Sequence, residues 1–88
     1  MSKRDEIQAT LRNFIFSQFP AARKHGLAET DSLLELGVVD SMGVLEVVAF
    51  LESEFAITLT DDDLMSDHFE SIASIADLVH HRLQESAL

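Results

Sequence analysis

The stretch GVVDSMGVLEVVAFLESEF, residues 37–55, joins a loop that begins with glycine to a long amphipathic segment. At about 100° per residue, one side of a helix that begins at Ser41 gathers apolar side chains. These are Val44, Val47, Val48, Leu51 and Phe55. The nearly opposite side carries Met42, Glu46, Ala49 and Ser53. The pattern predicts a helix over residues 41–55 with one buried face, and it leaves a methionine and an alanine beside a glutamate on the outer face.

Apolar residues at helical spacing also predict a first helix over residues 3–19. They are Ile7, Leu11, Phe14 and Ile15. Ser2 and Asp5 mark the start of this helix. Pro20 ends it, because the residue before a proline is pushed out of helical geometry.

Residues 20–40 are expected to form a long connection that contains Gly26 and Gly37. A connection of this length is usually functional or held by core contacts. Within it, DSLLELG, residues 31–37, has its own cap and predicts a short helical piece. Its three leucines, Leu33, Leu34 and Leu36, are expected to pin the connection to the core.

After residue 55, AITLT reads as a loop, and Thr60 followed by three aspartates predicts a short capped helix. Ser71 opens a last helix, whose inward residues are Ile72, Ile75, Ala76, Val79 and Leu83. Its last turns carry cationic residues, which suit the helix dipole there, namely His80, His81 and Arg82. The expected fold is all-α: a small four-helix bundle with three main helices and one or two short helical turns, in a single domain over residues 1–88.

Composition narrows the class of protein. With 88 residues and 47% apolar residues, the chain has material for one core. It has no cysteine, which excludes disulfides and cysteine-based zinc sites. The charged start MSKRDEIQ is not a signal peptide, and no apolar run approaches the roughly 20 residues of a membrane helix. We expect a cytoplasmic monomer that does not insert into membranes.

The charge of the chain is −10 and is unevenly distributed. Five of the six basic residues lie within the first 24 residues, whereas residues 25–81 hold thirteen acidic residues and no lysine or arginine. Such a surface repels nucleic acids and anionic lipids, and it attracts basic patches on other proteins. The alternative is that the charge serves solubility alone.

Ser41 raises the question of catalysis. The spacing of Gly37 and Gly43 does not form the G-x-S-x-G turn of a hydrolase, so we expect no enzyme. The aspartates at 61–63 lack a calcium-loop pattern. The histidines also lack the spacing of metal ligands, and they are His25, His68, His80 and His81. We therefore expect no metal site.

Two interpretations of Asp40-Ser41 remain. Both residue types are preferred at helix starts, so the pair is explained by capping alone. Alternatively, the serine hydroxyl is modified: a phosphodiester at this point would lie at the positive end of a helix, beside unsatisfied backbone N–H groups.

At these residues the sequence resembles the acyl carrier protein family. The resemblance covers most of the chain, including LGVVDSM, GVLEVVAFLESEF, AITLTDDDL and FESIASIADLV. It implies a four-helix carrier that is not itself an enzyme. The serine of its D-S-L or D-S-M motif receives 4'-phosphopantetheine from coenzyme A, and the arm holds acyl or aminoacyl groups as thioesters. Three residues separate Gly37 from Ser41, a spacing similar to D-alanyl carriers and other free-standing carriers that ATP-dependent ligases serve.

Carried over by motif, the resemblance makes Ser41 the attachment point, with Asp40 beside it. A phosphopantetheinyl transferase, an acyl or aminoacyl ligase, and acyltransferases or synthases with basic patches would be its partners. The outer face of the second main helix is expected to bind them, through Met42, Glu46, Ala49, Glu52 and Glu54. In the alternative, Met42 folds inward. The rival function is an acidic binding module, of the inhibitor or immunity type, without a prosthetic group.

Overall fold

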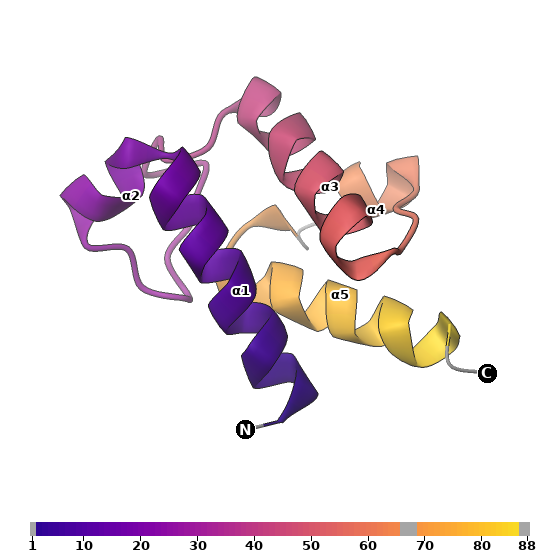
Figure 1. Cartoon of the computed structure of the whole chain (residues 1–88). Coiled ribbons are helices and arrows are strands. Elements are labelled where there is room, and N and C mark those ends of the chain that lie inside the picture. The colour runs from indigo at the N-terminus through magenta and orange to yellow at the C-terminus, as the bar shows by residue number, and fades with distance from the viewer. Residues whose placement is uncertain (1, 66–68, 87–88) are drawn as a thin grey trace.

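A computed structural model of the chain describes residues 2–65 and 69–86. In these residues it is helical, with five helices in the order α1 (Lys3–Gln18), α2 (Pro20–His25), α3 (Ser41–Phe55), α4 (Asp61–Met65) and α5 (Ile72–Ser86) (Figure 1). Three helices are long and two are short, which confirms the predicted helical bundle. His68 lies outside the described residues.

The core lies between the three long helices. Seven side chains of α1 and α5 are almost completely buried: Ile7, Leu11, Ile15, Ile72, Ile75, Ala76 and Val79. Val47 and Leu51 join them from the predicted inner face of α3. Burying one large aliphatic side chain contributes about 1.5–3 kcal/mol relative to leaving it exposed. The apolar periodicity of the three long helices therefore determines how they pack.

Local hydrogen bonds fix the predicted helix starts. In α1, Ser2 Oγ accepts from the N–H of Asp5 at 3.1 Å, and the Asp5 carboxylate accepts in return from the N–H of Ser2. The same reciprocal pair opens α4, where Thr60 Oγ1 accepts from the N–H of Asp63 at 3.2 Å and Asp63 Oδ2 accepts from the N–H of Thr60 at 2.9 Å. Such caps satisfy N–H groups that have no acceptor within the helix.

The prediction of a long connection over residues 20–40 is wrong for its first six residues, because residues 20–25 form α2. Pro20 ends α1 but also begins the next helix, since a first helical position requires no N–H donor. Ala22 is fully buried and holds α2 against the core. Gly26 then closes α2 with a left-handed conformation at φ 60°, which glycine adopts without strain.

The rest of the connection is held by Leu33. This residue is buried, and its carbonyl oxygen accepts from the N–H groups of Val38 and Val39 at 3.0 and 3.2 Å. The helical piece predicted for residues 31–37 is a turn instead, because the Leu33 carbonyl accepts from residues five and six positions later and not from the residue four positions later. Leu34 and Leu36 are exposed, so the prediction that they pin the connection is also wrong.

Arg82 has a different role from the one that its position predicted. Because α5 continues to Ser86, Arg82 does not lie in the last turn; its Nη2 contacts both carboxylate oxygens of Asp63 at 2.6 Å and joins α5 to α4. Burial acts to raise the pKa of Asp63, but hydrogen bonds from Thr60 and Arg82 outweigh it and leave that pKa below its ordinary value.

Candidate functional site

The site begins where α3 begins. Ser41 is the first residue of this helix and Asp40 is its N-cap. The Oδ1 atom of Asp40 accepts from the N–H of Gly43 at 2.7 Å, which satisfies one N–H group of the first turn. Asp40 and Met42 are both exposed. The candidate serine therefore lies at a capped helix start, between two residues that face solvent.

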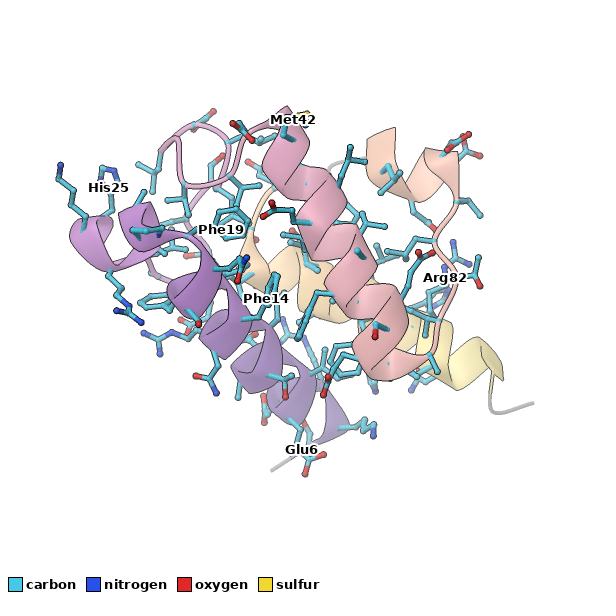
Figure 2. All side chains as sticks on the ribbon, turned by 45° about the horizontal axis from the view of Figure 1, so that its top comes forward. Glu6, Phe14, Phe19, His25, Met42 and Arg82 are labelled. Carbon is cyan, nitrogen blue, oxygen red and sulfur yellow. The ribbon has the colours of Figure 1, made fainter. Side chains whose placement is uncertain are left out.

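Gly43 allows the end of α1 to pack against this first turn. A Cβ atom at residue 43 would lie 3.0 Å from Cε1 of Phe19 and 3.1 Å from Cγ1 of Val39, closer than most Cβ contacts. Phe19 is the residue between α1 and α2, and Val39 is buried. Figure 2 labels Phe19 near this junction and Met42 at the start of α3. Phe19 and Val39 thus pack against the first turn of α3.

The outer face of α3 is apolar near its start. Met42 is 73% exposed, and Glu46 and Ala49 are also exposed, so their predicted orientation is confirmed. The same face carries Leu45, which is 57% exposed and was not among the residues predicted to lie there. Its position three residues after Met42 and four before Ala49 was the available signal, because such residues share one side of a helix.

Glu52 and Glu54 have other contacts or neighbours than the residues of this face. Glu52 is half-buried, and its Oε2 atom accepts from the backbone N–H of Leu59 at 3.0 Å, so it holds the loop after α3. Glu54 is exposed and lines a groove on the α1 side of α3. Because the Glu52 carboxylate is bound to the loop and Glu54 lines the groove, we omit both from the proposed docking face.

Other kinds of site are not seen in the described residues. Within residues 2–65 and 69–86, no three histidine, cysteine or acidic residues come together in a way that would hold a metal ion. None of the helices in that part of the chain has the length and apolar character needed to cross a membrane.

Comparison with known proteins gives the family. A family model described as a phosphopantetheine attachment site matches residues 15–81. The probable acyl carrier protein PigG of Serratia sp. (strain ATCC 39006) is 30% identical over 73 residues, which are 83% of this chain and 84% of that protein. The chain belongs to the acyl carrier protein family.

A solved structure agrees with this assignment. The crystal structure of an acyl carrier protein from Thermotoga maritima is 26% identical, with a TM-score of 0.66, and the match covers 93% of this chain and 92% of that one. The protein is thus an acyl carrier rather than an enzyme, and its prosthetic group is 4'-phosphopantetheine. These matches do not favour the rival interpretation as a binding module without a prosthetic group.

Proposed function

We propose that the carrier bears its phosphopantetheine on Ser41. The observation that supports this most is the position of Ser41, which is the first residue of α3, follows the N-cap Asp40 and lies within the matched span. An enzyme that loads the carrier must reach the hydroxyl from solvent. The exposed residues on either side, Asp40 and Met42, favour such access.

The residues at this helix start suit a phosphodiester. Helix geometry leaves the N–H groups of Ser41 and Met42 without acceptors inside the helix, and such groups favour an anion. The Asp40 carboxylate is engaged by the N–H of Gly43. When bound, the group supplies a flexible arm with a thiol that holds an acyl or aminoacyl group as a thioester. Tethering of this kind raises the effective concentration of the cargo at each docked enzyme.

Partner enzymes are proposed to dock on the outer face of α3. We define this docking face by Met42, Leu45, Glu46 and Ala49, which are all exposed. Met42 and Leu45 offer an adaptable apolar contact, and Glu46 attracts lysine or arginine on the partner. The partners proposed are a phosphopantetheinyl transferase, an ATP-dependent acyl or aminoacyl ligase, and acyltransferases or synthases. We propose that the carrier acts as a cytoplasmic monomer.

The attachment site is tested by loading two serine variants. The carrier is incubated with coenzyme A and a broad-specificity phosphopantetheinyl transferase, and its intact mass is measured. Ser41→Ala should stay unmodified and keep its helix content, because Asp40 remains as the cap. Ser53→Ala, an exposed serine of the same helix, is the matched control and should load fully. Loading of Ser41→Ala would place the arm elsewhere.

A further inference from the structure

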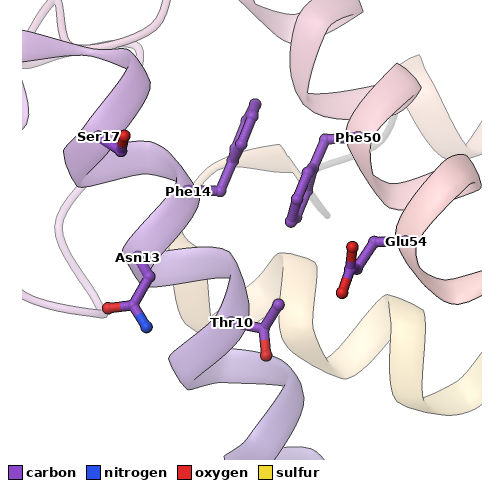
Figure 3. A pocket seen from close by; sticks show the side chains of 6 residues that line it. All are labelled: Thr10, Asn13, Phe14, Ser17, Phe50 and Glu54. Atoms are coloured by element: carbon purple, nitrogen blue, oxygen red, sulfur yellow. The ribbon is translucent and has the colours of Figure 1, made fainter.

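A groove of about 460 Å³ runs between α1 and α3, away from the start of α3 (Figure 3). Six residues line it: Thr10, Asn13, Phe14, Ser17, Phe50 and Glu54. The rings of Phe14 and Phe50 are stacked, with centroids 4.0 Å apart and planes 10° from parallel. The groove therefore combines aromatic surface with hydroxyl, amide and carboxylate groups.

The carboxylate in this groove is not neutralised by the chain itself. Glu54 is exposed, and no cation of residues 2–65 and 69–86 forms an ion pair with it. Both arginines of α1 are engaged elsewhere: Arg4 pairs with Asp77, and the Nε atom of Arg12 lies 3.7 Å from Glu29. The groove thus presents a negative charge beside aromatic rings, which is complementary to an organic cation.

Within this chain, Arg12 already contacts an aromatic ring and a carboxylate at the same time. The guanidinium carbon of Arg12 lies 4.6 Å from the centroid of the Phe16 ring, and the same side chain contacts the Glu29 carboxylate. A guanidinium group is planar and weakly hydrated, so it stacks on a ring and donates to a carboxylate at the same time. Phe50 and Glu54, four residues apart on α3, offer the same two groups.

We propose that the α1–α3 groove binds an arginine side chain of a partner protein. This inference rests on the proposed function, because the partner is an enzyme that docks on the outer face of α3. Glu46, Phe50 and Glu54 follow one another at intervals of four residues, so the groove borders that face. An enzyme that covers Glu46 can place an arginine against the face of Phe50 that Phe14 does not cover, on the side where Figure 3 shows Glu54.

The prosthetic arm is a less suitable occupant. Phe50 comes nine residues after Ser41 along α3. Nine residues rotate the helix by about 900°, which is two and a half turns, and advance it by about 13 Å. The groove therefore lies on the opposite side of α3 from the proposed attachment residue. An arm that entered it would have to wrap around the helix.

The proposal is tested with a small probe on the unmodified carrier. Nα-acetyl-arginine N-methylamide is added to ¹⁵N-labelled protein up to about 50 mM, since single side-chain contacts bind in the millimolar range or more weakly. The expected result is a saturable set of amide shifts confined to α1 and α3 around the groove, with much smaller shifts for the matching lysine amide. Equal shifts with lysine, or no localised shifts, would overturn the proposal.

Variants distinguish binding of the arginine probe in the groove from its general attraction to acidic residues. Glu54→Gln should weaken binding of the arginine probe by about three- to fivefold, because one ion pair is lost. Glu35→Gln removes the same charge from an exposed glutamate that neither lines the groove nor belongs to the docking face, and it should leave binding nearly unchanged. Phe50→Leu should abolish the preference for arginine over lysine. If Glu35→Gln and Glu54→Gln weaken binding equally, the site is not the groove.

The outcome is independent of the attachment site. The probe experiment uses protein without the arm, so its failure does not bear on Ser41, and failed loading of the carrier does not bear on the groove. The loaded carrier gives a further check. If loading alone produces the groove shifts without any probe, the arm is the occupant and the proposal is wrong.

Discussion

Replacing Arg82 with methionine should destabilise the carrier more than any surface substitution. The side chain of Asp63 is 8% exposed and that of Arg82 is 28% exposed. Breaking a fully buried ion pair costs about 3–5 kcal/mol, whereas exposed pairs contribute about 0–1 kcal/mol. Because Arg82 is partly hydrated, we expect Arg82→Met to lower the free energy of unfolding by about 2–3 kcal/mol. In a domain of this size, that corresponds to a melting temperature lower by about 8–24 °C.

Urea unfolding and thermal melting of two variants measure this effect. Arg23→Met is the matched control, because Arg23 is exposed and has no ion pair in the described residues; it should change the free energy of unfolding by less than about 0.5 kcal/mol. The same loss in both variants would show that the pair between α4 and α5 is not formed in solution.

The pH dependence follows from the pKa of Asp63. Its pKa in the folded state is lowered, so the unfolded state binds more protons in the acidic range. The stabilisation is therefore complete above the unfolded pKa of about 3.9 and is lost as the pH falls through the folded pKa. The difference in stability between wild type and Arg82→Met should be constant near neutral pH and shrink below about pH 4. A difference that grows on acidification would contradict this sign.

Three further predictions concern charge, docking and packing. Because residues 25–81 hold thirteen acidic residues and no lysine or arginine, the melting temperature should rise with added NaCl and further with millimolar magnesium; a flat dependence would contradict this. Met42→Ala should raise the KM of the transferase for the carrier with little change in melting temperature. Glu46→Lys should slow loading, and the loss should depend on salt concentration. Normal loading kinetics for both variants would place the docking face elsewhere. Gly43→Ala should lower the free energy of urea unfolding by up to about 2 kcal/mol, because crowding of Phe19 and Val39 by the new Cβ costs about 1–3 kcal/mol and the better helix propensity of alanine offsets about 1 kcal/mol of it; an unchanged midpoint would contradict the contact.

Sequence periodicity was sufficient for the parts of the fold that depend on neighbours in the chain. The boundaries of α3 and the outward direction of Met42 follow from the 3.6-residue period and one cap. The sequence pattern does not predict α2, because Pro20 indicates the end of α1, although proline is also favoured at a helix start.

Features that depend on distant residues were not predictable in this way. The pair of Asp63 and Arg82 joins residues 19 positions apart, and the reason for glycine at 43 is a ring at residue 19. The family resemblance places Glu52 among the residues that bind partners, but its carboxylate binds the backbone of a loop whose path the sequence does not show. Charge alone does not distinguish an exposed glutamate from one that holds a loop.

The central claim is that Ser41 carries the prosthetic arm. It is tested most directly by loading the wild-type carrier with coenzyme A and a phosphopantetheinyl transferase, digesting the product, and locating the added mass by peptide fragmentation. We predict one phosphopantetheine per chain, on the peptide that contains residues 40–43 and at the serine within it. A carrier that stays unmodified with a transferase active on another carrier, or an added mass on any other residue, would contradict the claim.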